Sequence, residues 1–296
     1  MTGRPYFSLV VPTLGRTTEL ARMLESLARS TCRDFECIVV DQNRGERLVP
    51  VLSPFGARFR LHRLHVGFRG AARARNHGAR HATGSVLNFP DDDCELPPTL
   101  LADVRERLEA RPVKVLIGMC VDRDGAASTT RFALDERALS AWSMWNRNIE
   151  FTAFFDRATF AAAGGYDERF GVGAAFGSDE GAELLIRLLR ALPPGEIRYD
   201  HRLRFFHPDK AADWSPAGLA RAYSYARGSG ALLAKWPTAP VLLHSARVLG
   251  GAVLGAAISG RRRRALYLGR LRGFMSGFAA YRARRAIDPA VERVQP

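Results

Sequence analysis

The sequence predicts an α/β protein with a doubly wound, mostly parallel sheet and a helical C-terminal appendage. Three observations favour this class. Strand-like and helix-like segments alternate through the first half of the chain, which is typical of repeated βα units. Acidic residues follow two of the strand-like segments, and open α/β sheets bind their ligands at such strand ends. Beyond Trp214 no strand pattern is found, and the chain is rich in Ala, Leu, Gly and Arg.

The first strand and helix have the clearest patterns. Residues 7–11 are a mostly apolar run, as expected for a strand that is buried on both faces. Thr17 or Thr18 can cap the helix that follows, in which Leu20 and Leu24 lie one turn apart. The other segments expected in the first half are strands at 35–40, 60–66, 86–89 and 113–121, and helices at 70–81 and 98–110.

The second half is less regular. The segments noted there are a short apolar stretch at 151–155, a helix at 157–163 ended by Gly164-Gly165, a glycine-rich loop at 171–177, and a strand at 196–207. An amphipathic helix follows the loop, because Leu184 and Leu188 recur at helical spacing. Ser178 or Asp179 can cap this helix.

The positive charge of the chain is concentrated at its C-terminal end. Residues 211–296 contain 14 Lys or Arg and three acids, a net charge of +11, so only +3 of the total of +14 belongs to residues 1–210. Anionic lipid, nucleic acid and acidic glycan all attract clustered arginine. Charge alone does not separate them, but we expect no nucleic acid because no recognition motif accompanies the arginines.

One segment of the C-terminal region is long and apolar enough to meet a membrane. Residues 240–259 are mostly apolar, and four consecutive arginines, Arg261 to Arg264, follow at once. His244, Arg247 and three glycines argue against a deeply buried span. We expect a membrane-surface or re-entrant helical region. A true span and a soluble packing element or dimer contact are the alternatives.

The chain opens without a charged and then apolar leader, because residues 1–6 lead straight into the first strand. We therefore expect a cytoplasmic protein that is peripheral at the cytoplasmic face of the inner or plasma membrane. Cys32, Cys37, Cys94 and Cys120 show no metal-ligand spacing. We expect four free thiols.

Three consecutive carboxylates, Asp91, Asp92 and Asp93, follow the strand at 86–89. Acids this close raise one another's pKa unless a cation compensates, and hard oxygen ligands select Mg²⁺ or Mn²⁺ over zinc. The sequence therefore predicts a divalent metal site. The alternative is a solvated acidic turn that caps the helix beginning near Pro97.

Six motifs in order resemble those of the family-2 glycosyltransferases, inverting enzymes of the GT-A fold that use a nucleotide-diphospho-sugar donor. The motifs are Val10-Val11-Pro12-Thr13-Leu14, Val39-Val40-Asp41-Gln42, Ala74-Arg75-Asn76-His77-Gly78, Ala82-Thr83-Gly84 with the acidic triplet, Gly164-Gly165-Tyr166-Asp167-Glu168-Arg169-Phe170, and Glu180-Gly181-Ala182-Glu183-Leu184 with Arg187. The resemblance covers residues 6–210. It implies a catalytic domain at 1–213, with a nucleotide-binding half at 1–121 and an acceptor half at 122–213, before a basic helical region at 214–296.

The resemblance also implies a donor site. The residues expected to bind the donor are Pro12, Thr13, Leu14, Asp41, Arg75, Asn76, Asp91 and Asp92, and those expected to bind Mg²⁺ or Mn²⁺ are Asp93, Asp91 and His207. Asp41 would accept hydrogen bonds from the base, and its alternative is a helix or turn cap. Arg75 would meet phosphate or orient a carboxylate, and its alternative is a solvated helix face. His207 has a structural role as its alternative.

The catalytic base is where the chain departs from the family. An inverting transfer needs a carboxylate that takes the acceptor proton, and the family supplies it from a Glu-Asp pair before a helix. Here Glu180 matches the Glu and Gly181 stands where the Asp is expected. Glu180 is the preferred base and Asp179 the second candidate, whose alternative is a helix cap. A chain without catalysis is the third possibility.

The acceptor side is expected to hold Trp142, Trp145, Tyr166, Asp167, Glu183 and Arg187. Aromatic faces stack on sugar rings, and core packing is the competing explanation for the tryptophans. The Q-x-x-R-W element of processive relatives is missing, which favours transfer of one sugar. We expect an inverting, metal-dependent glycosyltransferase that acts on a lipid-linked or polysaccharide acceptor. A nucleotide-sugar-binding protein without catalysis is the alternative.

Overall fold

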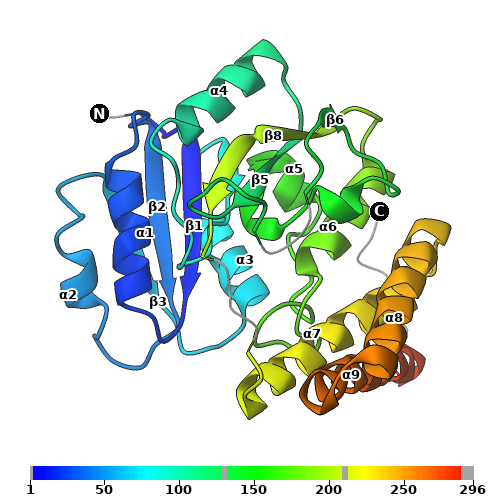
Figure 1. Cartoon of the computed structure of the whole chain (residues 1–296). Helices are drawn as coiled ribbons and strands as arrows, with labels where there is room; N and C mark the ends of the chain where they lie inside the picture. The colour runs from blue at the N-terminus through cyan, green and yellow to red at the C-terminus, as the bar shows by residue number, and fades with distance from the viewer. Residues whose placement is uncertain (1–2, 129–131, 209–212, 288–296) are drawn as a thin grey trace. The chain divides into compact units, whose positions relative to one another are not determined.

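The computed structural model describes residues 3–128, 132–208 and 213–287 (Figure 1). The chain divides into two compact units, which we call the sheet unit (1–167 and 184–209) and the helical unit (168–183 and 210–296). The elements are β1 Phe7–Thr13, α1 Thr18–Ala28, β2 Phe35–Asp41, α2 Val49–Leu52, β3 Arg60–His65, α3 Ala71–His81, β4 Val86–Asn88, α4 Leu100–Ala110, β5 Val115–Val121, β6 Glu136–Ala138, the 3₁₀ turns η1 Met144–Asn146 and η2 Glu150–Thr152, β7 Ala153–Asp156, α5 Arg157–Ala162, α6 Glu180–Ala191, β8 Ile197–Phe206, α7 Pro216–Lys235, α8 Ala239–Ile258 and α9 Arg261–Ile287.

The sheet unit is built on one eight-stranded sheet in the order β3-β2-β1-β4-β7-β5-β8-β6. β1 pairs in parallel with β2 and β4, so that Phe7 lies opposite Phe35 on one side and Val86 on the other. All seven residues of β1 and of β2 are buried. Strands that are covered on both faces need the continuous apolar runs that the sequence shows.

One inserted strand sets the direction of the rest of the sheet. β7 is antiparallel to both β4 and β5, while β8 is parallel to β5. Two reversals restore the original direction, so β5 and β8 run the same way as β1, β2 and β4. The carboxyl ends of β1, β2, β4 and β8 therefore meet at one edge of the sheet, where α/β folds bind ligands.

A glycine sets how closely α3 approaches the sheet. A Cβ atom on Gly78 would collide with the side chains of Val10 on β1 and Val40 on β2. Only glycine permits this contact, so the sequence of α3 holds the helix directly against the two strands. This packing fixes the place of Arg75, which lies one turn earlier on the same helix.

Backbone contacts between helices hold the helical unit together. A Cβ atom on Gly230 of α7 would collide with the carbonyl of Phe274 on α9, and one on Gly277 of α9 would collide with the carbonyl of Arg227 on α7. Small residues at helix contacts let two backbones approach closely. α8 completes the unit, and its mean hydropathy of 1.7 and length of 20 residues suffice for a membrane span.

The predicted α/β class and the helical C-terminal region are confirmed, with two differences in detail. β7 is antiparallel to its neighbours β4 and β5, and β6 is antiparallel to β8, so the sheet is mixed. The sequence analysis missed β6 and α2, because β6 is a fully exposed edge strand and α2 has only four residues. Residues 168–183 belong to the helical unit, and the expected catalytic domain at 1–213 stays a prediction.

Candidate functional site

Four strands bring polar side chains to one edge of the sheet. Thr13 ends β1, Asp41 ends β2, residues 91–93 follow β4, and His207 follows β8. Because these strands run in the same direction, side chains that are far apart in the sequence share this edge. The edge is therefore the place where the sheet unit can bind a ligand.

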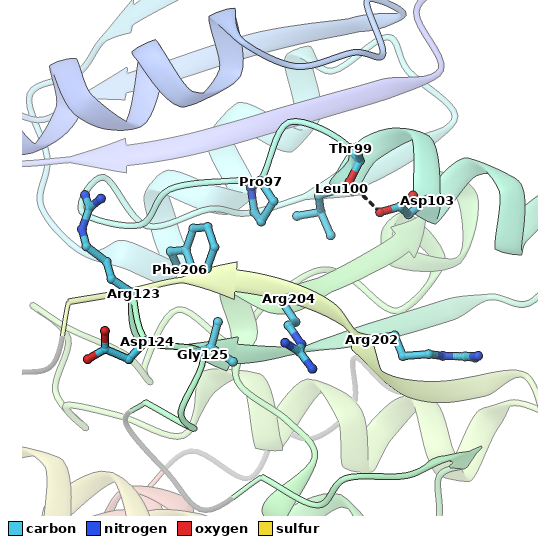
Figure 2. Close-up of a pocket in the computed structure, with 11 residues that line it drawn as sticks. Pro97, Thr99, Leu100, Asp103, Arg123, Asp124, Gly125, Arg202, Arg204 and Phe206 are labelled. Carbon is cyan, nitrogen blue, oxygen red and sulfur yellow. Dashed lines mark hydrogen bonds between the residues drawn. The ribbon is translucent and has the colours of Figure 1, made fainter.

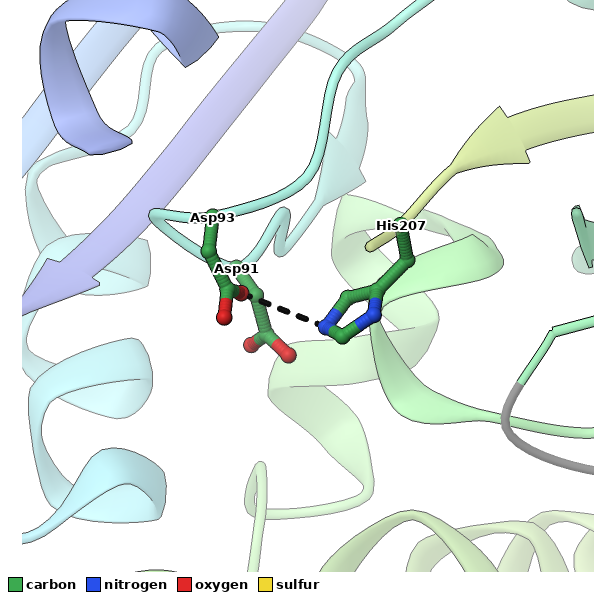
Figure 3. A group of neighbouring side chains, drawn as sticks. All are labelled: Asp91, Asp93 and His207. Carbon is green, nitrogen blue, oxygen red and sulfur yellow. Dashed lines mark ion pairs between the residues drawn. The ribbon is translucent and has the colours of Figure 1, made fainter. Parts of the chain in front are cut away.

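Asp91, Asp93 and His207 form a group that can hold a metal ion. One ligand atom from each residue lies within 4.8 Å of the other two, and Figure 3 shows the imidazole facing the two carboxylates. His207 Nε2 lies 3.3 Å from Asp93 Oδ1. Two carboxylates and an imidazole suit Mn²⁺, and the carboxylates also suit Mg²⁺. These residues fit the metal that the sequence predicts.

The hydrogen bonding of His207 prepares it to be a ligand. The side chain is buried, and Nδ1 lies 2.8 Å from the carbonyl oxygen of Pro208. A carbonyl can only accept, so Nδ1 donates to it, and Nε2 is the ring nitrogen that faces Asp93. The ring also stacks on Phe151, with centroids 5.4 Å apart. Such an outer hydrogen bond is how metal-binding histidines are usually oriented.

Arg16, which the sequence analysis did not single out, joins two acids of the triplet. Its Nη1 atom lies 2.6 Å from Asp92 Oδ1 and 2.7 Å from Asp93 Oδ2. Thr13 Oγ1 donates to Asp92 Oδ2 at 2.7 Å. Burial raises the pKa of Asp92, while the Arg16 guanidinium and the Thr13 hydroxyl act in the opposite direction. The loop after β1 therefore supplies a cation to the acids after β4.

Arg75 is buried beside the third acid. Only 2% of its side chain is exposed, and Nη2 lies 2.8 Å from Asp91 Oδ1 and 3.8 Å from Glu150 Oε1. Its guanidinium also lies over the ring of Tyr166, 5.7 Å from the centroid. A solvated helix face, the alternative for Arg75, is wrong. Arg75 orients a carboxylate of the triplet.

Asp41 is fully buried in a network of protein donors. Its Oδ1 accepts from the backbone N–H of Asn43 at 2.9 Å, which is the turn-capping bond given as the alternative role. Its Oδ2 accepts from Arg63 Nε at 2.9 Å. Asn43 in turn accepts from the backbone N–H of Gly15 at 2.7 Å. The network ties the loops after β1 and β2 together, and the contact of Asp41 with a base stays a prediction.

The other donor candidates lie on three different parts of the sheet unit. Pro12 is buried within β1, and Leu14 just beyond the strand is 43% exposed. Asn76 on α3 has a different partner: its amide donates to the carbonyl of Tyr166 and accepts from the N–H of Tyr166, both at 2.8 Å. Asn76 thus positions the Gly165-Tyr166 loop.

The predicted acceptor residues of the sheet unit differ in exposure. Tyr166 is buried and packs against Phe89 and Phe160, with ring centroids 5.3 and 5.4 Å apart. Trp142 is 60% exposed, whereas Trp145, on η1, and Asp167 are partly buried. Of the three aromatic residues, Trp142 therefore presents the most open ring face.

Arg187 supports the same loop as Asn76. It lies on α6, and its Nη2 atom donates to the carbonyl of Gly165 at 2.7 Å, while Nη1 donates to the carbonyl of Ala163. Both carbonyls lie at the end of α5, where the chain turns. Arg187 holds this turn, which accounts for its place in the motif.

The two candidate bases lie in the helical unit, at the start of α6. Glu180 is 3% exposed, and its carboxylate lies against Gly171. A Cβ atom on Gly171 would be 2.8 Å from Glu180 Oε1, and the φ angle of +101° also favours glycine there. The glycine-rich loop therefore makes room for the Glu180 carboxylate.

Asp179 has a backbone conformation that is unusual for a residue other than glycine. Its φ angle is +70°, a region in which Asp is one of the few tolerated residues. Its Oδ2 accepts from Ser178 Oγ at 2.6 Å and from Ser229 Oγ on α7 at 2.9 Å. Its side chain therefore joins α7 to the loop. Strain of this kind is often found at functional sites.

Glu183, one helical turn after Glu180, is fully buried and forms an ion pair within the helical unit. Lys235 Nζ, at the end of α7, lies 2.6 Å from Glu183 Oε1. Trp236 Nε1 lies 3.4 Å from the same oxygen. A buried carboxylate needs such partners, because an unpaired buried charge is strongly destabilising. Glu183 therefore holds the start of α6 to α7.

The sequence analysis missed three functional partners. Arg16, Arg63 and Lys235 meet their acids only after folding, across separations of 76, 22 and 52 residues. Arg16 had a weak signal, because it follows the motif at the end of the first strand. The four cysteines are free, as predicted.

A separate polar cavity of about 390 Å³ lies in the sheet unit, beside β5 and β8 (Figure 2). Arg123, Arg202 and Arg204 line it together with Asp103 and Asp124. None of the predicted site residues lines this cavity. The candidate site is therefore the sheet edge rather than this cavity.

The sequence profile described as Glycosyl transferase family 2 matches residues 8–164, which is more than half of the chain. The chain belongs to glycosyl transferase family 2. The matched range extends from β1 into the turn after α5 and includes Asp41, Arg75 and the acidic triplet. It ends before Asp179 and Glu180, so this match does not bear on the base.

Several curated glycosyltransferases are similar to this family-2 chain. A PGL/p-HBAD biosynthesis glycosyltransferase of Mycobacterium bovis is 31% identical over 179 residues, which cover 57% of this chain and 66% of that protein. A validoxylamine A glucosyltransferase of Streptomyces hygroscopicus is 33% identical over 126 residues, 40% of this chain and 30% of that protein. An uncharacterised glycosyltransferase of Haemophilus influenzae is 36% identical over 105 residues, 36% of this chain and 35% of that protein. The matches thus span 30% to 66% of the length of these relatives.

Solved structures of low sequence identity share the fold of the family-2 chain. The mannosyltransferase PcManGT of Pyrobaculum calidifontis, in complex with GDP-Man and Mn²⁺, has a TM-score of 0.61 at 17% identity and covers 96% of this chain and 88% of its own. TarS 1–349 of S. aureus in complex with UDP has a TM-score of 0.55 at 16% identity, with 94% and 91% covered. The GT-A-type fold is confirmed.

Proposed function

We propose that this protein transfers one sugar, with inversion, from a nucleotide-diphospho-sugar to a lipid-linked or polysaccharide acceptor in cell-surface glycan synthesis. The observation that carries the proposal is the meeting of Asp91, Asp93 and His207 at the ligand-binding edge of the sheet. His207 Nε2 faces this group, 3.3 Å from Asp93 Oδ1. A donor set of this kind suits a metal ion that binds a diphosphate.

The donor would lie along the edge formed by β1, β2 and β4. Asp91 and Asp93, with His207, would hold Mg²⁺ or Mn²⁺, and the bound metal would neutralise charge on the departing diphosphate. Arg16 and Arg75 already pair with the triplet, and their positive charge favours an anionic ligand at the same edge. The solved complexes with UDP and with GDP-Man support a nucleotide-sugar donor.

The transfer itself needs one proton acceptor. A hydroxyl oxygen of the acceptor would form the new bond to the anomeric carbon, on the face opposite the diphosphate, while the bond from that carbon to the diphosphate oxygen breaks. Glu180 would take the hydroxyl proton as general base. Its place in the pocket made by Gly171 supports this role, and Asp179 is the second candidate.

The acceptor class is supported more weakly than the donor class. The basic helical unit favours acceptors at an anionic surface, which includes lipid-linked glycans. Trp142 has the exposed ring face that stacking on a sugar requires. The missing Q-x-x-R-W element supports transfer of a single sugar. We place the protein at the cytoplasmic face of the inner or plasma membrane.

The second candidate function is nucleotide-sugar binding without transfer. Gly181 stands where the family has an acid, and this observation favours it. Both functions require donor binding. They differ in turnover alone, so a donor that binds but is never transferred to any acceptor would establish the second function.

Calorimetric titration with UDP-, GDP- and dTDP-sugars, each with Mn²⁺ and with EDTA, tests the proposal. We expect one nucleotide class to bind, in Mn²⁺ only. Asp93→Asn should abolish the metal-dependent part of donor binding, because one metal ligand and one negative charge are lost. Asp124→Asn removes an exposed acid of the same unit and should bind like the wild type. Equal binding in EDTA would refute the metal, and no binding of any nucleotide sugar would refute both functions.

A further inference from the structure

We infer that α8 and α9 form a membrane-docking face, in which an apolar surface of α8 enters the interface of an anionic bilayer and the arginines of both helices bind its headgroups. This inference goes beyond the transfer reaction and does not depend on it. It concerns the helical unit alone and rests on exposure, packing and charge.

The outward surface of α8 is apolar along the helix except at Arg247. Leu242 is 50% exposed, Val253 57%, Leu254 60% and Ile258 75%. Only 22% of the apolar window of this helix is buried within the protein. The core helix of a soluble protein would be mostly buried, so this surface has no partner among the described residues. Contiguous apolar surface of this kind marks a protein or membrane contact.

The opposite side of α8 packs on α9, which lies beside it (Figure 1). Val241, Ser245, Ala252 and Gly255 are the buried residues of α8. A Cβ atom on Gly255 would lie 2.5 Å from the ring of Tyr267, so the helix and the ring are in direct contact. Two residues, 259 and 260, separate α8 from α9, so the two helices fold back on each other as a hairpin. One face of α8 is thus occupied, and the other is open.

The charge around this apolar surface has one sign. Residues 239–287 contain ten arginines and no acidic residue. Arg261, Arg262, Arg263 and Arg264 are all exposed at the start of α9, next to the exposed Ile258. Arg247 is exposed among the apolar residues of α8, where its long side chain can reach headgroups while the helix lies in the interface. An apolar stripe bordered by arginine is the pattern of an interfacial helix.

A span across the bilayer fits this arrangement poorly. Because α8 is packed against α9 as a hairpin, insertion of α8 would carry the exposed Arg270 and Arg272 of α9 into the hydrocarbon. Each arginine at the bilayer centre is costly, and no acid of α9 is available to pair with it. A helix that lies in the plane of the interface keeps these arginines in contact with water and headgroups.

Two other occupants of the face are disfavoured by the same charges. A second copy of the chain would bring the exposed arginines Arg261 to Arg264 of one copy toward those of the other, since a two-fold interface joins identical surfaces. Nucleic acid would match the charge but not the row of exposed Leu, Val and Ile side chains. An anionic lipid surface is the partner that matches both features.

Vesicle flotation tests the docking face. The full-length wild type should float with vesicles that contain phosphatidylglycerol and stay in solution with phosphatidylcholine alone. Leu254→Ser/Ile258→Ser should lower the partition coefficient by about tenfold, because apolar area no longer enters the interface. Replacement of Arg261 to Arg264 by Gln should lower it by at least about a hundredfold at low salt.

Matched variants outside the face control for composition and charge. Leu134→Ser changes a leucine of the sheet unit that is 72% exposed. Replacement of Arg4, Arg22, Arg111 and Arg190 by Gln removes four exposed arginines of the sheet unit. Both should float like the wild type. Donor titration of every variant reports whether the sheet unit is folded, so a failure to dock and a failure of the proposed reaction can be told apart.

Four results would overturn the inference. They are equal flotation with neutral vesicles, no loss in the Leu254/Ile258 variant, equal losses in the control variants, and binding to a DNA duplex without binding to vesicles. A dimer in light scattering that the Leu254→Ser/Ile258→Ser change dissociates, with flotation unchanged, would assign the face to a second copy instead.

Discussion

Charged side chains are concentrated both at the sheet edge and on the α8–α9 face, but they are paired with opposite charges only at the sheet edge. At the sheet edge each carboxylate has a cation beside it: Arg75 with Asp91, and Arg16 with Asp92 and Asp93. On α8 and α9 the arginines have no acid in the same segment to pair with. Paired and buried charges have fixed directions and can recognise one ligand geometry. Exposed charges of one sign have no fixed geometry, and they suit a surface rather than a molecule.

The largest effect should come from the base, and it should separate binding from turnover. Glu180→Gln is expected to lower the transfer rate by about 10²–10⁴-fold, because the proton acceptor is lost, while donor affinity at the sheet edge stays unchanged. Product formation and donor titration measure the two effects. Asp179→Asn is the matched comparison. If Asp179→Asn loses turnover and Glu180→Gln does not, the base is Asp179.

A second test asks whether the Glu183–Lys235 ion pair stabilises the helical unit. Lys235→Met should lower the free energy of unfolding by about 3–5 kcal/mol, because Glu183 is left buried without its cation. Urea denaturation of the variant measures the loss. The double variant Glu183→Leu/Lys235→Met should recover most of the stability, since no charge is then buried. Equal losses in the single and double variants would contradict this account.

Replacement of Arg16, the cation beside Asp92 and Asp93, should have a smaller effect on stability. Arg16→Gln should lower the free energy of unfolding by about 1–2 kcal/mol, less than a fully buried pair because Arg16 is one third exposed. Arg16→Gln should also weaken donor binding. Arg16→Lys keeps the positive charge, so its stability and donor affinity should lie between those of the wild type and those of Arg16→Gln. Urea denaturation and donor titration measure these changes. An Arg16→Gln protein with wild-type stability and donor affinity would show that Arg16 is dispensable.

Acid should weaken the sheet unit through Asp200 on β8. Burial would raise the pKa of Asp200, but hydrogen bonds from Arg202 and Arg107 prevail and lower it from 3.8 to about 2. Because the pKa is lower in the folded protein, this contribution to stability is complete above about pH 4 and is lost as the pH falls toward 2. Urea denaturation between pH 2 and 5 should show a weaker pH dependence in Asp200→Asn. Identical slopes in variant and wild type would refute the linkage.

The sequence predicted those parts of the fold that depend on local pattern. β1 and β2 were predictable because a strand buried on both faces must be apolar throughout. β6 was not, because an exposed edge strand such as Glu136–Ala138 can have any composition. The assignment of residues 168–183 to the helical unit was not predictable either, since it depends on contacts such as that of Asp179 with Ser229.

In the candidate site, too, some features could be predicted from local sequence and others could not. The acidic triplet was predictable because three adjacent carboxylates are a local feature. Arg16 was not, because only the folded chain brings it beside Asp92. The place of His207 beside Asp93 was expected, but only from the family resemblance, because the two residues are far apart in the sequence. Asn76 and Arg187 were correctly noticed as motif residues, but their hydrogen bonds to Tyr166 and Gly165 show that they support a loop.

The membership of residues 168–183 in the helical unit has a consequence for how the enzyme would meet its two substrates. The donor is dissolved in water and would reach the sheet unit by three-dimensional diffusion. The candidate base, Glu180, belongs to the unit that we expect to adhere to the bilayer, where a lipid-linked acceptor diffuses in two dimensions. Turnover would then follow the mole fraction of acceptor in the membrane rather than its bulk concentration, and dilution with inert lipid would slow the reaction.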